Sequence, residues 1–360
     1  MKKIIFFPYH PDIRTIIDFK NDLVNYEISG VISYKEDQHL IEPLNRAIGV
    51  YIDDCDELIS ACDAIILLDN YRDYHFEKYL QVIDSARKKN KQVIITPLAL
   101  IQLRQKYNIE NFLVLEKYPK DYLSSSEVNT ASVRTSLRRN SIPIIAILGM
   151  GINCDKFYVQ LLTNQALRQR YKIASINSNA LGTLFDNYTL PSFLYDSMQF
   201  QEKIFRFNEY FDFVARESNA DAIIIGIPEG IAPFDVQEFH HFAEYPLIIS
   251  KAVFIDIAIF CSYLLNGSEF EIGLKDIIEK SQIKFEVPIA AYAMSRTIFE
   301  IPNDENEKIA FDHLEGNYLE RTYPSLAFSA YPALNLLNLE SAKEIILECI
   351  QKLANNVEAM

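Results

Sequence analysis

Glycine, lysine and acidic side chains meet in two short stretches of a chain that otherwise contains few glycines. Ten of the 360 residues are glycine, whereas an average protein has about 7%. Four of these ten lie in Gly149–Phe157 and Asp221–Gly230. Glycine lets the backbone approach a ligand closely, and backbone N–H groups together with a lysine ammonium bind anions. The two stretches therefore predict an anion site.

The first stretch, Gly149–Phe157, follows the apolar run Ile142–Leu148 and precedes a segment with apolar residues at helical spacing. In a P-loop, a strand, a glycine-bearing loop, a lysine and a helix follow one another in this order. The loop N–H groups and the helix N-terminus then hold phosphate. The residues that we expect to line the anion here are Gly149, Gly151, Asn153, Cys154, Asp155 and Lys156.

This loop departs from the strict P-loop pattern at two positions. Lys156 follows Gly149 by seven residues, a spacing that resembles the loop of dethiobiotin synthetase-like ATPases. In that register Asp155 replaces the glycine before the lysine, and Phe157 replaces the Ser or Thr that would bind Mg²⁺. An acidic side chain beside the lysine adds negative charge where phosphates would lie. Two interpretations stay open: a site for ATP or GTP with Mg²⁺ or for another anion, and a turn that no longer binds nucleotide.

The second stretch, Asp221–Gly230, resembles the Walker B strand and switch of the MinD and nitrogenase iron-protein branch. Gly226 stands where that pattern has its magnesium-linked Asp. Glu229 is the acidic residue that could substitute for it, or orient a water or a partner. Gly226, Glu229 and Gly230 complete the predicted site. Ligands bind at the carboxyl ends of strands in open α/β sheets, so we expect the two loops to lie side by side.

The elements that must position these loops alternate between strand and helix along the chain. Short apolar runs separated by helical stripes are typical of a parallel sheet covered on both faces. We predict an α/β protein with two domains: a Rossmann-like parallel sheet over residues 1–118, a linker over 119–141, and a P-loop NTPase-like parallel sheet over 142–360. Residues 267–324 give no clear pattern.

On the motifs Gly149–Phe157 and Ile224–Phe234, the sequence resembles a bacterial family of peptide maturation system proteins. These occur in clostridial natural-product gene clusters, beside radical SAM enzymes and short precursor peptides. Asn-Cys-Asp-Lys-Phe stands in place of Gly-Lys-Ser/Thr in that family too. The resemblance extends over most of the chain. It implies an accessory or modifying component in the maturation of a ribosomally made (RiPP) peptide, with the precursor peptide and a radical SAM maturase as partners.

Three hypotheses about activity follow. In an enzyme, Lys156 would neutralise phosphate charge, and Glu229 or Asp155 would hold the metal or position a nucleophile. In the second, the chain is a non-catalytic scaffold or chaperone for precursor peptide or the radical SAM partner. In the third, Cys154 acts in a metal- or thiol-dependent modifying enzyme, because a helix N-terminus and Lys156 would lower a thiol's pKa. No catalytic residue is assigned by the sequence.

Histidines mark two weaker candidates. His240 and His241 follow the second glycine stretch by about ten residues, and adjacent histidines on a regular element diverge. We therefore expect exposed polar residues there, with one histidine lining the site as the alternative. His10 and Asp12 follow the first strand, where we favour a helix cap at Asp12 over a role in ligand binding.

Composition excludes several classes of protein. The net charge is −14, from 35 basic and 49 acidic residues, so nucleic acid and anionic membrane are unfavourable partners. The five cysteines form no CxxC pair, which argues against a structural zinc site, and we predict no metal ligands. Apolar runs stay far below the roughly 18 residues of a membrane span, and we expect a cytoplasmic protein.

Overall fold

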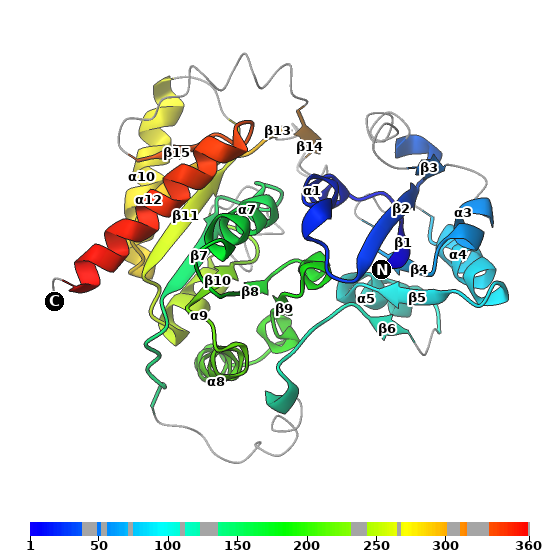
Figure 1. The fold of residues 1–360 in the computed structure, drawn as a ribbon, viewed down its shortest axis with the longest axis horizontal. Coiled ribbons are helices and arrows are strands. Elements are labelled where there is room, and N and C mark those ends of the chain that lie inside the picture. Colours follow the sequence, from blue (N-terminus) through cyan, green and yellow to red (C-terminus); the bar gives the residue numbers. More distant parts are fainter. Residues whose placement is uncertain are drawn as a thin grey trace. The chain divides into compact units, whose positions relative to one another are not determined.

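In the computed structural model (Figure 1), the chain divides into two units: Met1–Lys117 with Ala180–Thr189, and Tyr118–Asn179 with Leu190–Met360. The structure describes residues 1–37, 49–51, 56–70, 75–108, 112–122, 136–231, 243–264, 268–300, 310–314 and 331–358. Each unit is built around a sheet of parallel strands, and each is described by itself below.

The first sheet has, among the described residues, six strands in the order β3-β2-β1-β4-β5-β6, and each neighbouring pair is parallel. The strands are β1 (Lys2–Phe7), β2 (Tyr26–Ile32), β3 (Gly49–Tyr51), β4 (Ala64–Leu67), β5 (Gln92–Ile95) and β6 (Leu113–Val114). The chain leaves β1 in one direction along the sheet and later continues from β4 in the other. The carboxyl ends of β1 and β4 therefore mark the point where the strand order reverses, as in a Rossmann fold.

Helices cover one face of this sheet with apolar side chains. One core contains β1 and β4 residues such as Phe7 and Leu67 together with Ile59, Tyr79 and Leu103 from three helices. The helices and 3-10 turns of this unit are α1 (Asp12–Asp18), η1 (Lys20–Asp22), η2 (Lys35–Asp37), α3 (Asp56–Ala61), α4 (Glu77–Lys88), α5 (Pro97–Lys106) and η4 (Ala180–Phe185). This core includes side chains of α3, α4 and α5, so these three helices cover the same face of the first sheet.

The second sheet has the order β15-β12-β11-β7-β10-β8-β9 among the described residues. Its strands are β7 (Ile144–Gly149), β8 (Ile173–Asn177), β9 (Tyr188–Thr189), β10 (Ala222–Gly226), β11 (Ile257–Ser262), β12 (Ile289–Met294) and β15 (Ala333–Leu334). Neighbours from β15 to β8 are parallel. β7 and β11 are buried along their whole length, as expected of central strands covered on both faces.

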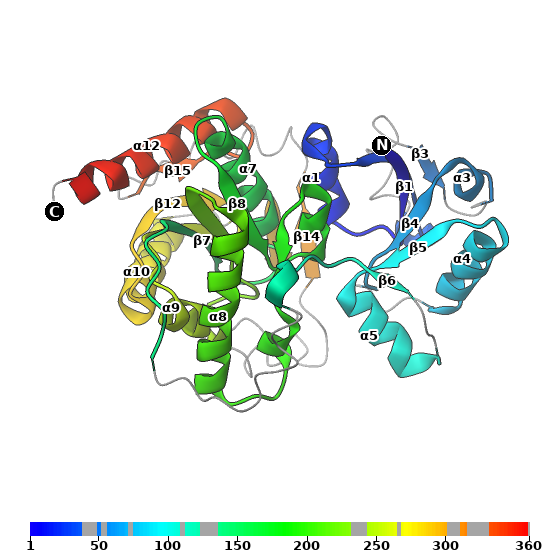
Figure 2. The ribbon, with the colours of Figure 1, turned by 60° about the horizontal axis from the view of Figure 1, so that its bottom comes forward.

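Figure 2 shows α7 and α12 over one face of this sheet and α8, α9 and α10 over the other. The helices and turns are α7 (Lys156–Arg168), η5 (Ser192–Tyr195), α8 (Phe200–Ser218), α9 (Glu244–Ala252), α10 (Ser268–Phe285) and α12 (Leu339–Glu358). Two further strands, β13 (Thr297–Glu300) and β14 (Ala310–His313), form an antiparallel pair. In the part of the chain that the structure describes, no helix combines the length and hydropathy that a membrane crossing requires.

The predicted α/β class with two parallel sheets is confirmed. Leu247–Ser250 reads as a short apolar run but belongs to helix α9. A short apolar run has no period that separates a strand from a buried helix, and Pro246 fits the first turn of a helix. The predicted linker contacts α8 in its described parts: the rings of Tyr122 and Tyr210 lie 5.0 Å apart, and Arg138 pairs with Asp212.

Candidate anion site

The two glycine loops leave the same edge of the second sheet from adjacent strands. β7 and β10 pair in parallel, with Gly226 opposite Ile147. Beyond the strands the loops stay in contact, because the backbone N–H of Ile231 lies 3.1 Å from the carbonyl oxygens of both Gly149 and Met150. The expectation that the two loops lie side by side is confirmed.

The contact between the loops depends on glycine at position 230. A Cβ atom built on Gly230 would overlap the backbone of Gly151 and the carbonyl oxygen of Met150. Both neighbours are main-chain atoms, which cannot rotate away as a flexible side chain can. The two loops therefore touch through their backbones, and a larger residue would separate them.

Lys156, the first residue of α7, ties the two loops together. Its ammonium nitrogen Nζ donates to the carbonyl oxygen of Glu229 at 2.6 Å and to that of Gly151. It also lies 3.6 Å from Cys154 Sγ. Among the residues that the structure describes, no carboxylate lies within ion-pair distance of Nζ. Within the described residues, the positive charge is thus met by two carbonyl dipoles and a neutral sulfur, and an anionic oxygen would be a stronger partner.

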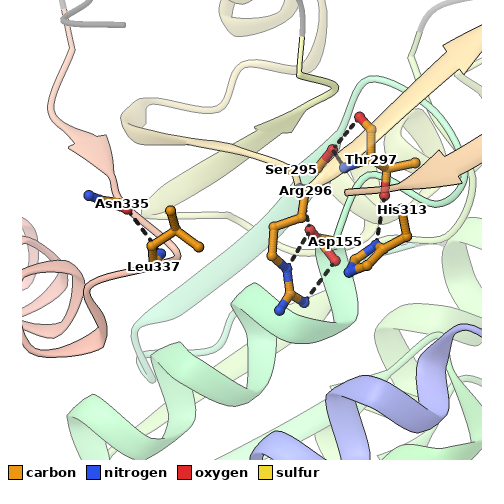
Figure 3. A network of polar contacts seen from close by, with 7 residues as sticks. All are labelled: Asp155, Ser295, Arg296, Thr297, His313, Asn335 and Leu337. Atoms are coloured by element: carbon orange, nitrogen blue, oxygen red, sulfur yellow. Dashed lines mark hydrogen bonds and ion pairs between the residues drawn. The ribbon is translucent and has the colours of Figure 1, made fainter. Parts of the chain in front are cut away.

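Asp155 immediately precedes this lysine in a left-handed backbone conformation, with φ 57° and ψ 20°. Its side chain makes no capping bond to α7. Instead the carboxylate accepts hydrogen bonds from Arg296: from the backbone N–H at 2.7 Å, from Nε at 3.3 Å and from Nη2 at 3.3 Å (Figure 3). The Arg296 guanidinium in turn lies 4.0 Å from the centre of the Tyr158 ring.

These contacts decide the charge of Asp155. Burial by itself raises the pKa of the carboxyl, but the positive charge of Arg296, then that of His313, and the hydrogen bonds from Arg296 outweigh it. The net effect holds the pKa of Asp155 below its ordinary value. The aspartate is therefore ionised, and its charge is paired with Arg296 rather than directed at Lys156.

The usual magnesium ligands of a P-loop site are missing from the geometry as well as from the sequence. Phe157 is buried in α7 and offers no hydroxyl. Gly226 is covered by Gln160, whose amide donates to the Ile176 carbonyl at 2.9 Å and lies where a Cβ on Gly226 would be. No group of three or more acidic, histidine or cysteine side chains in the described ranges could hold a metal ion. These residues do not fit a bound Mg²⁺.

Cys154 lies beneath the loop, with 1% of its surface exposed. Its thiol donates to the Gly151 carbonyl at 3.1 Å. Cys261, on β11, is a close neighbour: burial first, and then Cys154, raise the pKa of the Cys261 thiol well above its ordinary value. Both thiols therefore belong to the interior at the base of the site.

Glu229, in the second loop, again has a left-handed backbone, φ 53°. Two tyrosines surround it. The rings of Tyr195 and Tyr245 are 5.3 Å apart, and burial together with the Glu229 carboxylate raises the pKa of both. Asn153, also left-handed at φ 54°, is exposed at the tip of the first loop. Tyr195 and Tyr245 thus lie near the Glu229 carboxylate.

Sequence reasoning missed two residues of this site. Arg296 follows β12 by two positions, and Tyr263 directly follows β11, where its hydroxyl donates to the Ile152 carbonyl. Both lie just beyond the carboxyl ends of strands, which is the signal that could have found them. For Arg296 that signal was hidden, because it falls in the stretch 267–324 whose pattern was unclear.

Of the histidine candidates, the structure describes only His10. His240 and His241 are outside the described residues. His10, in the first unit, contacts two carboxylates: Nδ1 is 3.3 Å from Asp12 and Nε2 is 3.6 Å from Asp69. The expected helix cap at Asp12 is wrong, because Pro11 is the N-cap residue of α1 and Asp12 begins the helix. Asp12 contacts His10 instead.

Comparison with solved structures supports the fold. A DUF1611 family protein from Anabaena variabilis aligns with a TM-score of 0.59 and 11% identity, over 98% of this chain and 100% of that one. At this identity the likeness describes the fold and no more. No protein-family model and no curated protein matches the chain.

Two further structures match with lower scores. An apo GTPase from Pyrococcus abyssi has a TM-score of 0.29 and 13% identity, over 42% of this chain and 66% of that one. A pseudomurein peptide ligase type C from Methanothermus fervidus has a TM-score of 0.26 and 12% identity, over 81% and 44%. Scores this low carry no argument about the present chain. The class rests on its own fold and site: an α/β protein with a P-loop-like strand, loop and helix.

Proposed function

We propose that the loops Gly149–Lys156 and Gly226–Gly230 bind the anionic group of a nucleotide or of another phosphate- or carboxylate-bearing ligand, without a divalent metal. The observation that carries this proposal is the Lys156 ammonium, which is partly buried and held between two backbone carbonyls. An anion entering here would meet an ammonium that has no carboxylate partner among the described residues. It would also meet the N–H groups at the start of α7, where the side chain of the N-cap residue Asp155 makes no capping bond.

Metal-free binding follows from the donor set. A nucleoside triphosphate in a P-loop site normally shares its charge between a lysine and Mg²⁺. Here Phe157 and Gly226 supply no metal ligand, and the Asp155 carboxylate is hydrogen-bonded to Arg296. The remaining carboxylate of the two loops is Glu229. We therefore expect one compact anionic group to be held by Lys156 and backbone N–H groups.

In the cell, this site would serve the maturation of a ribosomally made peptide, as the family resemblance of the two motifs implies. The chain would be an accessory or modifying component that contacts the precursor peptide or a radical SAM maturase. A pull-down with the precursor peptide encoded beside this protein tests this role. Retention of the peptide supports it, and a peptide that passes through in the presence and absence of ATP contradicts it.

Isothermal titration calorimetry tests the anion site itself. ATP and GTP are titrated into the wild type, each with and without Mg²⁺, and then into Lys156→Ala. We expect binding that Mg²⁺ does not strengthen, and a loss of at least about tenfold in Lys156→Ala, or about 1.4 kcal/mol. Lys172→Ala is the matched control, because Lys172 is exposed directly before β8. No heat with wild type at millimolar nucleotide would contradict nucleotide binding.

A further inference from the structure

The Asp155–Arg296 ion pair bears on the negative charge that the loop sequence places directly before Lys156. A glycine normally precedes the lysine of a P-loop, since this position needs backbone freedom and no charge. Asp155 takes up the left-handed conformation of that position, and its carboxylate would weaken an anion site if it were uncompensated. A second group must therefore cancel this charge and hold it to one side.

Arg296 is built to do both. It presents three N–H groups to the one carboxylate, one of them from its backbone. Planar guanidinium groups hold carboxylates in a defined orientation in this way. Both side chains are nearly buried, with 11% of Arg296 and 9% of Asp155 exposed. Solvent therefore screens the pair little, and its charges cancel locally.

The backbone around Arg296 is fixed independently of Asp155. The N–H of Ser295 donates to the Ser262 carbonyl at 2.7 Å, and this bond ties the backbone before Arg296 to the end of β11. The carbonyl of Arg296 accepts from the N–H of Leu314 at 2.8 Å, just after β14. Figure 3 shows the Arg296 side chain extending from this anchored backbone to Asp155 beside the start of α7.

From these contacts we propose that Arg296 is a positioning residue of the anion site. It neutralises Asp155 and holds the carboxylate away from Lys156, so that an aspartate can occupy the place of the P-loop glycine. This inference rests on the proposed anion binding. It adds a requirement that a simple strand-to-helix turn lacks: affinity for the anion depends on the charge of Asp155 being cancelled.

Calorimetric titration of Mg²⁺-free ATP and of inorganic pyrophosphate into four variants tests the proposal. Arg296→Gln exposes the Asp155 charge, and we expect binding at least tenfold weaker than wild type. Arg296→Lys keeps the positive charge but not the planar guanidinium with its several N–H donors, and we expect a smaller loss of affinity. In the double variant Asp155→Asn/Arg296→Gln no charge remains to be cancelled, and we expect affinity to recover by at least fivefold over Arg296→Gln. Arg216→Gln removes an exposed arginine that pairs with Asp212 on α8 and should bind as wild type does.

The double variant separates positioning from a merely structural role. Because the neutral double variant also recovers stability, each affinity is corrected for the folded fraction that urea denaturation gives. A double variant that then binds no better than Arg296→Gln would overturn the proposal. Wild-type affinity in Arg296→Gln would overturn it too.

If circular dichroism shows that Arg296→Gln does not fold, Arg296→Lys and the double variant are compared directly. The proposal then requires Arg296→Lys, which keeps an incompletely paired Asp155, to bind more weakly than the double variant. Absence of binding in the wild type would end the proposed function and this inference together. Binding that Lys156→Ala abolishes but Arg296→Gln leaves unchanged would end this inference alone.

Discussion

The ammonium nitrogen of Lys156 lies 2.6 Å from the carbonyl oxygen of Glu229, a residue 73 positions further along the chain. This contact joins the loop after β7 to the loop after β10. It places a positive charge where two backbones meet, at the carboxyl edge of the sheet. Parallel pairing of the two strands makes the contact possible, and the same pairing defines where a ligand would lie.

Gly230 is predicted to be essential for this junction. Gly230→Ala places a methyl group against the backbone of Gly151 and Met150, so the loops must separate. Overpacking of this kind costs about 1–3 kcal/mol. We expect urea denaturation to give a free energy of unfolding lower by about that amount, and calorimetry to show loss of ATP binding.

The matched control is Gly273→Ala, on α10, where an added Cβ has no heavy atom within 4 Å. Alanine favours a helix over glycine by about 1 kcal/mol. This variant should therefore be as stable as the wild type or more so. Equal stability of the two alanine variants would show that the loops are not in backbone contact.

His10 is predicted to make the first unit less stable at alkaline pH. Burial disfavours its charge, but Asp69 and then Asp12 outweigh burial and raise the pKa of His10 from 6.5 to about 9. A raised folded-state pKa gives stability that is complete below pH 6.5 and is lost as the pH rises through about 9. The N–H of Asp12, 3.2 Å from Nδ1, favours the neutral ring and reduces the gain, so we expect a loss of about 2–3 kcal/mol.

Urea denaturation at several pH values between 6 and 10 measures this loss. His10→Gln should flatten the profile in this range, because glutamine carries no titrating proton. His75→Gln, at an exposed position, should keep the wild-type slope. A His10→Gln profile that falls as steeply as the wild type's would refute the assignment to His10.

Cys154 is predicted to react slowly with thiol reagents in the native protein. Its surface is 1% exposed and its thiol is bonded to the Gly151 carbonyl. Mass spectrometry after a short iodoacetamide treatment should find Cys154 modified only once the protein is unfolded. Rapid native labelling of Cys154 would instead favour the thiol-dependent enzyme over the anion site.

Much of the site could be predicted from the sequence because its main features are local or follow from strand pairing. The apolar run before Gly149, the helical stripe after Lys156 and the apolar run before Gly226 define two strand ends and one helix. In a parallel sheet the carboxyl ends of neighbouring strands lie at the same edge, and this geometry brings the two loops together.

The remainder depends on contacts between distant parts of the chain. Arg296 reaches Asp155 across 141 residues, and no period or motif announces such an ion pair. Asp155 alone therefore predicts weaker phosphate binding, whereas the structure pairs its carboxylate with Arg296. Likewise, Ala180–Thr189 belongs to the first unit although it follows β8 in the chain, and local composition carries no signal for that return.

A crystal structure of the protein with Mg²⁺-free ATP or pyrophosphate tests the central claim most directly. The account predicts a phosphate oxygen about 3 Å from Lys156 Nζ, in place of at least one of the two carbonyl contacts, with Asp155 still bonded to Arg296. A ligand bound elsewhere, with Nζ still on the carbonyls of Gly151 and Glu229, would contradict it.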